Sequence, residues 1–153
     1  MNQDKKNNCF KDLAGNTFDS PSQIKKILSP YLNDFQIHVG CDSQEKGSYV
    51  DFNVSLIFYS SKNGCKIFNF RERHSFFKNR FLRLWHEVTK SLEIANLLNC
   101  HCTIHLDLSE NEKQFSNALT ASGKGYIESY GYTVKTKPDA WAASKVADIF
   151  CRD

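Results

Sequence analysis

The segment Gln36–Ser43, with the sequence Gln-Ile-His-Val-Gly-Cys-Asp-Ser, has the alternating pattern of a β-strand, apolar on one face and ending on a carboxylate on the other. A second segment, Thr103–Leu108, repeats the pattern and carries Asp107 where the first carries Asp42. If the two strands lie side by side, the two carboxylates stand together, and their repulsion raises a pKa or recruits a divalent cation. Either Asp alone is explained as well by a turn cap at a strand end, so the matched pair is what indicates a site.

The composition is that of one globular domain. The chain has 153 residues, 41% of them apolar, and its net charge of +3 does not by itself indicate nucleic-acid binding. We expect residues 1–16 to form a loose polar segment and residues 17–153 a single domain. No apolar run is long enough to span a membrane, and Met1–Asn8 lacks the apolar core of a signal peptide, so we expect a cytoplasmic protein with no membrane partner and six reduced cysteines. The sequence leaves the oligomeric state open.

Helix and strand signals alternate along the chain in a way typical of an α/β protein. The expected elements are a helix from Ser20 to Pro30, strands at Gln36–Asp42, Tyr49–Ser60 and Cys65–Arg73, a helix at Asn79–Leu98, a strand at Thr103–Leu108, helical structure over Ser109–Tyr130 broken near Ser122–Gly125, a strand at Tyr132–Lys137 and a helix at Asp139–Phe150. The apolar stripe of the long helix is Phe81, Leu84, Trp85, Val88, Leu92 and Ala95. Three meandering strands followed by two strands reached through right-handed crossovers predict a mixed five-stranded sheet of order 3-2-1-4-5, flanked by helices.

This topology brings four carboxylates toward one end of the sheet. Asp42 and Asp107 lie at the carboxyl ends of adjacent parallel strands, where open α/β sheets keep their sites. Glu87 lies at the edge of the apolar stripe, and Asp139 starts the last helix directly after the fifth strand. Asp148, half a turn from Asp139 around the same helix, is the alternative fourth member, and we favour Asp139 because it follows the strand directly. Four such groups need counter-charge, which the oxygen-binding cations Mg²⁺ or Mn²⁺ supply.

Four segments together resemble the YkuK family, a bacterial group related to ribonuclease H. They are His38–Gln44 (His-Val-Gly-Cys-Asp-Ser-Gln), Arg83–Val88 (Arg-Leu-Trp-His-Glu-Val), Ile104–Leu108 (Ile-His-Leu-Asp-Leu) and Lys135–Ser144 (Lys-Thr-Lys-Pro-Asp-Ala-Trp-Ala-Ala-Ser). The resemblance runs from about Phe10 to the C-terminus and implies an RNase H-like fold. It also implies phosphodiester hydrolysis with two metal ions, one activating the attacking water and the other stabilising the leaving oxygen.

On this resemblance, Asp42 bridges both ions, Asp107 and Glu87 hold one ion, and Asp139 holds the other. The implied function is a divalent-metal-dependent nuclease that cuts RNA, an RNA/DNA hybrid or branched DNA. The alternative is a non-catalytic nucleic-acid- or protein-binding module on the same fold, which the modest net charge favours. A third possibility, a small-molecule phosphohydrolase, needs a closed pocket.

Polar residues beside the carboxylates are candidates for nucleic-acid binding. Ser43 and Gln44 either orient a substrate phosphate or cap the turn, and Lys135 and Lys137 either meet a phosphate backbone or are solvated. The segment Arg71–Arg83 mixes basic and phenylalanine side chains, which suits contact with phosphates and bases as well as a charged soluble face.

Two histidines share the carboxylate face of the predicted strands. We expect His38 and His105 to be satisfied histidines beneath the site rather than ligands or proton shuttles. Cys100, His101 and Cys102, taken with His105, suggest zinc at first sight. The strand alternation divides these four side chains between two faces, so we expect no zinc site there.

Overall fold

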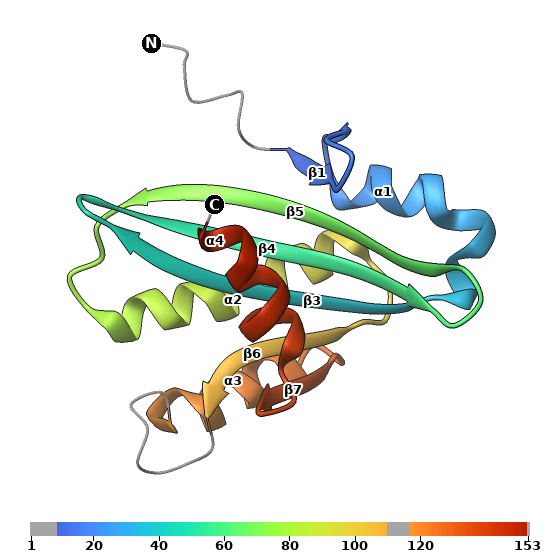
Figure 1. The fold of residues 1–153 in the computed structure, drawn as a ribbon. Coiled ribbons are helices and arrows are strands. Elements are labelled where there is room, and N and C mark those ends of the chain that lie inside the picture. Colours follow the sequence, from blue (N-terminus) through green and yellow to red (C-terminus); the bar gives the residue numbers. More distant parts are fainter. Residues whose placement is uncertain (1–8, 110–116, 153) are drawn as a thin grey trace.

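The computed structural model describes residues 9–109 and 117–152, which form a twisted sheet with helices on both faces (Figure 1). The strands are β1 (Phe10–Asp12), β2 (Thr17–Phe18), β3 (Gln36–Lys46), β4 (Tyr49–Ser60), β5 (Gly64–Ser75), β6 (Thr103–Ser109) and β7 (Thr133–Lys137). The helices are α1 (Pro21–Leu28), the 3₁₀-helix η2 (Ser29–Asp34), α2 (Arg80–Leu98), α3 (Asn117–Glu128), the π-helix η3 (Ala142–Ala147) and α4 (Asp148–Arg152). Within these ranges, no helix has the length and apolar character needed to cross a membrane.

The sheet is mixed and has seven strands in the order β2-β1-β5-β4-β3-β6-β7. Strands β3, β4 and β5 form a long antiparallel meander, and β6 and β7 run parallel to β3. The prediction of five strands is therefore wrong in strand number, and the order of the whole sheet differs because β2 and β1 extend it. The five predicted strands keep their predicted relative order, β5-β4-β3-β6-β7. The parallel contact between β3 and β6, on which the predicted site depends, is present.

The two additional strands come from the N-terminal segment and extend the β5 edge. Phe10 of β1 is 2% exposed and packs against Phe70 of β5 with ring centres 5.2 Å apart. The buried Phe10 ring fixes this mostly polar N-terminal segment to the edge of the sheet. Within the segment of residues 1–16, Phe10–Asp12 form β1, and residues 1–8 lie outside the described part of the chain.

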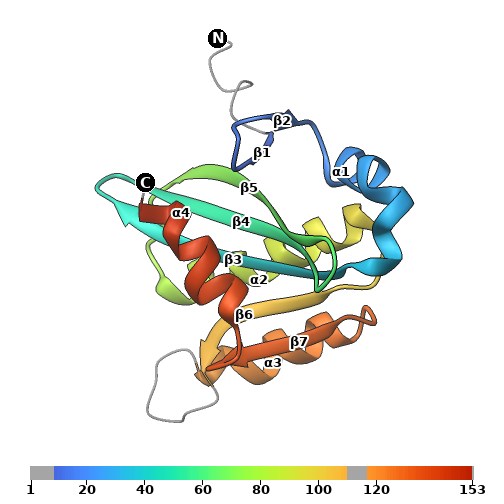
Figure 2. The same ribbon diagram turned by 45° about the vertical axis from the view of Figure 1, so that its right-hand side comes forward.

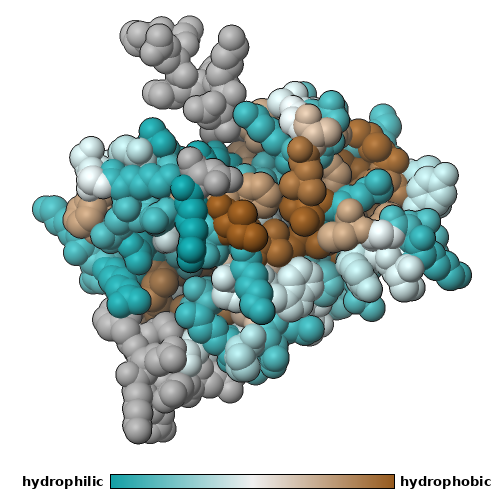
Figure 3. Space-filling view, viewed as in Figure 1, coloured by the Kyte–Doolittle hydropathy of each residue, from teal (hydrophilic) through white to brown (hydrophobic). Residues whose placement is uncertain are grey.

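The helices cover the two faces of the sheet unequally. Helices α2 and α3 lie behind the sheet in Figure 1, and the C-terminal segment of η3 and α4 crosses the front, as the turned view confirms (Figure 2). Helix α1 is tied to α2 because the Ser22 hydroxyl donates to the Leu97 carbonyl oxygen at 3.1 Å. On the front face, hydrophobic residues gather between the C-terminal helix and α1 (Figure 3). The main core lies under α2 and α3 and includes Val39, Phe52, Phe58, Leu92 and Leu106.

The buried face of helix α2 differs from the apolar stripe predicted for it. It begins after Asn79, whose side chain accepts the Phe81 backbone N–H, and it ends at Asn99 in the left-handed conformation. Leu84, Val88, Leu92 and Ala95 are buried. Phe81, expected in the stripe, is 41% exposed, whereas Glu87 is only 5% exposed. The helix is therefore rotated so that a carboxylate is held under it.

Two predicted helices differ from those observed. The expected break at Ser122–Gly125 is absent, because a Cβ on Gly123 would lie 3.3 Å from Val88 and the missing side chain lets α3 pack closely on α2. The expected helix Asp139–Phe150 begins only at Ala142, since the Asp139 N–H donates to the Thr136 carbonyl oxygen in a turn. Residues 110–116, expected to be helical, lie outside the described ranges.

Gly40 decides how closely the C-terminal segment approaches the sheet. A Cβ at this position would lie 2.3 Å from the Ala142 carbonyl carbon, far inside van der Waals contact. The backbone of η3 therefore rests directly on β3, two residues before Asp42. Glycine at residue 40 thus brings the last helix onto the strand that carries the first carboxylate.

Candidate functional site

Asp42 and Asp107 occupy equivalent places on neighbouring parallel strands. The pairing of β3 with β6 aligns Gly40 with His105, and each Asp follows two residues later. The pKa of Asp42 rises from 3.8 to about 7, because burial penalises the carboxylate and the negative charge of Asp107 repels it. The predicted carboxylate pair is therefore assembled.

Asp148, the first residue of α4, joins this group from the C-terminal helix. Its side chain hydrogen-bonds that of Asp42, and its charge contributes to the raised pKa of Asp42. Helix α4 is fixed there because the Cys151 thiol donates to the Asp42 carbonyl oxygen at 3.2 Å and the Asn53 amide donates to the Cys151 sulfur at 3.4 Å. A hydrogen bond between two carboxyl groups requires a proton on one of them, which is why this contact helps to raise the pKa of Asp42.

Glu87 reaches the cluster from α2, on the opposite face of the sheet. The Ser43 hydroxyl donates to its Oε1 at 2.5 Å, and burial together with Asp42 and Asp107 raises its pKa well above 4.5. Arg83, one helical turn earlier, opposes this rise but also pairs with Glu45 at 2.6 Å. Ser43 therefore contacts a carboxyl group of the cluster directly, which is neither of the two roles that the sequence suggested for it.

Asp139 lies elsewhere, in a polar pocket between β7 and η3. Its side chain is exposed, and the pocket has a volume of about 630 Å³. The lining residues are Lys124, Val134, Lys135, Thr136, Lys137, Pro138, Asp139, Trp141 and Lys145. Lys137 connects this pocket to the carboxylates, because its ammonium group lies 3.1 Å from Asp107 Oδ1. Gln44, the remaining predicted contact residue, is exposed on β3.

His38 and His105 form a buried pair next to the carboxylates. The Ala142 backbone N–H donates to His105 Nδ1 at 3.3 Å, so a neutral His105 carries its proton on Nε2, which lies 3.0 Å from His38 Nδ1. Trp141 packs on both rings with centres 4.7 Å apart. Burial lowers the pKa of His105 to about 3 and lowers that of His38, so both imidazoles are neutral near pH 7. They are satisfied histidines that support η3, as expected.

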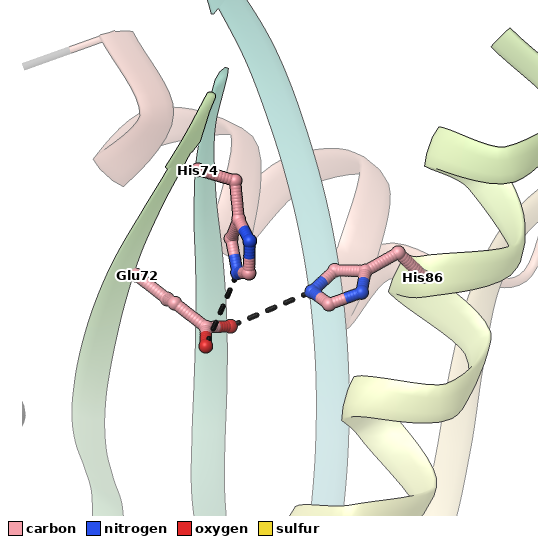
Figure 4. A group of neighbouring side chains, drawn as sticks. All are labelled: Glu72, His74 and His86. Atoms are coloured by element: carbon pink, nitrogen blue, oxygen red, sulfur yellow. Dashed lines mark ion pairs between the residues drawn. The ribbon is translucent and has the colours of Figure 1, made fainter. Parts of the chain in front are cut away.

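A second titratable cluster lies farther along the face that α2 covers and was not foreseen. Glu72 and His74 project from β5, and His86 projects from α2 toward them (Figure 4). Glu72 Oε1 lies 3.2 Å from His74 Nε2, and Glu72 Oε2 lies 3.5 Å from His86 Nε2. The contact with His86, together with His74 and Lys90, lowers the pKa of Glu72 to about 2. The sequence signal for this cluster is the spacing of two between Glu72 and His74, which places both on one face of a strand.

The donor set of the acidic cluster fits a hard divalent cation. Asp42, Glu87, Asp107 and Asp148 offer only oxygen ligands, and Asp107 Oδ1 is buried with no hydrogen bond inside the chain. In this structure, Lys137 supplies the counter-charge at that oxygen. The carboxylates of the acidic cluster are too far apart to hold one ion as they stand. Across residues 9–109 and 117–152, the group that brings three ligand atoms within 4.8 Å of one another is Glu72, His74 and His86. Ion binding at the acidic cluster therefore requires the carboxylates to draw together and Asp107 to release Lys137.

The fold is a mixed α/β sheet whose neighbouring parallel strands β3 and β6 each carry a carboxylate near their ends. Helices on both faces add two more, so the class is an α/β protein with an acidic centre. The family model described as Ribonuclease H-like matches residues 21–152, and the chain belongs to this family. This match confirms the resemblance that the four sequence segments carry and supports a fold related to nucleic-acid enzymes. No curated protein matches the chain.

Proposed function

We propose that this protein is a divalent-metal-dependent nuclease that hydrolyses phosphodiester bonds in RNA, an RNA/DNA hybrid or branched DNA. The observation that carries the proposal is the convergence of three strand and helix carboxylates on Asp42, whose pKa rises to about 7. Concentrating acids in this way is unfavourable for a metal-free protein and becomes favourable once a cation binds. Membership of the Ribonuclease H-like family supports the choice of a phosphodiester as substrate.

The residues that would hold Mg²⁺ or Mn²⁺ are Asp42, Glu87, Asp107 and Asp148. Bound divalent ions would supply water activation and charge stabilisation at the leaving oxygen. Asp148 takes the place expected for Asp139, because it contacts Asp42 and Asp139 is exposed in the neighbouring pocket. Ser43 keeps the Glu87 carboxyl group oriented toward the cluster.

The lysine-lined pocket would bind the substrate backbone. Lys135, Lys137 and Lys145 line one cavity that adjoins Asp107. Positive side chains neutralise phosphates and give affinity without sequence preference. Lys137 would exchange Asp107 for a phosphate when the ion binds, which couples substrate binding to completion of the metal centre.

A non-catalytic binding module is the second candidate, and one observation favours it. The Lys137 ammonium group already neutralises Asp107 at 3.1 Å, which is the arrangement of a charge pair that needs no metal. The same lysine pocket would then bind nucleic acid without cleavage.

The test is calorimetric titration of Mg²⁺ and Mn²⁺ into the native chain and into Asp42→Asn and Asp107→Asn, followed by cleavage of labelled RNA, hybrid and four-way DNA substrates. The matched control is Asp19→Asn, an exposed Asp before α1. We expect metal binding and cleavage in the native chain and the control, and loss of both in the two cluster variants. Nucleic-acid binding without metal uptake or cleavage would establish the binding module instead.

A further inference from the structure

The three ligand atoms of the Glu72–His74–His86 cluster are arranged around one point. Two imidazole nitrogens face the two oxygens of one carboxylate at 3.2 Å and 3.5 Å, as the dashed lines in Figure 4 mark. Ligands of a four-coordinate zinc ion, bound at 2.0–2.2 Å, lie about 3.3 Å from one another. One ligand atom from each of the three residues lies within 4.8 Å of the other two. The two histidine–carboxylate contacts are as short as the spacing between neighbouring ligands on one metal ion.

These atoms lack the hydrogen bonds that would otherwise explain their burial. Glu72 Oε2, His74 Nε2 and His86 Nε2 are each buried as atoms, and none makes a hydrogen bond of acceptable geometry within the chain. A buried polar atom without a well-formed hydrogen bond costs free energy, so such atoms are rarely left together. A cation at their centre would satisfy all three at once.

Aromatic rings fix the two imidazoles. The Phe52 ring contacts those of His74 and His86 with centres 5.5 Å and 4.4 Å apart, and Phe77 packs on both. The side chains of Glu72, His74 and His86 are 25%, 32% and 26% exposed, so the cluster lies near the surface although its ligand atoms are buried. Ligands held by packed rings suit a site in which three protein groups bind one ion and a water takes the fourth position.

Lys90 is the group that opposes a cation here. Its ammonium group lies 3.3 Å from Glu72 Oε2, but it also lies 3.2 Å from Glu93 Oε2. Glu93 can therefore keep Lys90 paired when the Glu72 carboxylate turns to a metal ion. The positive charge of Lys90 is compensated locally and does not close the site.

We propose that Glu72, His74 and His86 form a binding site for a transition-metal dication of the zinc type, separate from the acidic cluster. Two imidazoles and one carboxylate form a ligand set that zinc accepts and that Mg²⁺ does not favour. The ion would join β5 to α2 one residue before Glu87. Phe52 lies between Ser43 and Glu72 in the paired rows of β3, β4 and β5, and so separates this site from the acidic cluster.

The experiment uses the full chain freed of metal with a chelator and titrated with Zn²⁺, and with Co²⁺ as a spectroscopic probe. We expect one equivalent of Co²⁺ to give the visible absorption of four-coordinate cobalt, displaced by Zn²⁺. His74→Gln and His86→Gln should each abolish it. His101→Gln, an exposed histidine, and Asp42→Asn, in the acidic cluster, should both retain it. Lys90→Met keeps all three ligands and should bind the metal at least as tightly as the native chain.

A measurement on the unaltered protein removes any doubt about folding of the variants. Of the five histidines in the chain, zinc should shift the imidazole NMR resonances of His74 and His86 and leave those of His38, His101 and His105 in place. The proposal is overturned if the native chain gives no tetrahedral cobalt spectrum, if the spectrum survives in the variant lacking both His74 and His86, or if other histidines respond instead. None of these outcomes depends on nuclease activity, so failure here leaves the proposed function untouched.

Discussion

The carboxyl groups of Asp42 on β3 and Asp148 on α4 are hydrogen-bonded to each other, although β3 and α4 are far apart in the sequence. The contact exists because Gly40 lets η3 rest on β3 and because Cys151 bonds the Asp42 carbonyl oxygen. Two carboxyl groups held this close repel each other when both are ionised, and a divalent cation bound to them would relieve that repulsion.

The raised pKa of Asp42 makes the stability of the metal-free protein depend on pH. Its pKa is about 7 in the folded chain and 3.8 in the reference state. The contribution of this group to the free energy of unfolding is therefore fully present below about pH 4 and is lost as the pH rises through 7. The loss amounts to a few kcal/mol, since one pKa unit corresponds to about 1.4 kcal/mol. We expect urea unfolding in chelator to show a stability decrease between about pH 4 and pH 7 that shrinks in Asp42→Asn. Asp19→Asn serves as the control, and an undiminished decrease in Asp42→Asn contradicts the assignment.

Asp148 and Asp139 should differ in metal binding. Asp148→Asn removes a carboxylate in contact with Asp42 and is expected to weaken Mg²⁺ or Mn²⁺ affinity by about 10-fold or more. Asp139→Asn alters an exposed side chain in the neighbouring pocket and should leave the ion affinity unchanged. Calorimetry on both variants decides between them, and the reverse ranking would return the fourth position to Asp139.

Ser43→Ala should damage the site without changing a carboxylate. The Ser43 hydroxyl donates to Glu87 Oε1, so its loss leaves a buried carboxyl oxygen without that partner. We expect cleavage to fall by about 10–100-fold, as for other residues that orient metal ligands. Ser48→Ala, at an exposed turn residue, is the control. Rescue by Ser43→Thr, which restores the hydroxyl, separates orientation of Glu87 from a general structural effect.

Two glycine-to-alanine changes should have opposite effects. Gly40→Ala places a Cβ 2.3 Å from the Ala142 carbonyl carbon and should cost about 1–3 kcal/mol or more by forcing η3 off β3. Gly125→Ala, within α3 and with nothing near its new Cβ, should stabilise the chain by about 0.5–1 kcal/mol. Chemical denaturation of both variants measures the difference. Equal effects would mean that the close approach at Gly40 is absent in solution.

Lys135 should contribute to nucleic-acid binding through charge alone. Lys135→Ala is expected to weaken binding similarly for all sequences and to reduce the slope of log K against log salt by about one. Lys66→Ala, an exposed lysine on β5, is the control. Binding by fluorescence anisotropy at several salt concentrations tests this, and an unchanged slope places the phosphate backbone elsewhere.

Several parts of the site could be predicted because they depend on local pattern. The alternation around Asp42 and Asp107 gives the face and the end of each strand, and parallel pairing then brings the two carboxylates together. Glu87 was predictable for a similar reason, since helical spacing separates it from the outward-facing Glu93. The prediction that His38 and His105 are satisfied histidines beneath the site rests on the same alternation, which places both on the carboxylate face.

Other parts required contacts between distant segments. β1 and β2 were missed because a three-residue strand gains its stability from Phe10 packing on Phe70, not from its own composition. The Glu72–His74–His86 cluster joins β5 to α2, and the basic and aromatic residues around it suggested a nucleic-acid contact instead.

The sequence by itself determined that this is an α/β chain with matched carboxylates on two strands and one acid on a long helix, because side-chain periodicity is set by backbone geometry. Only the tertiary structure decided that Asp148 rather than Asp139 meets Asp42. That choice depends on where the last helix begins and how closely it lies on the sheet. Both are set by the turn at Thr136–Asp139 and by the space that Gly40 leaves for η3, which no local pattern encodes.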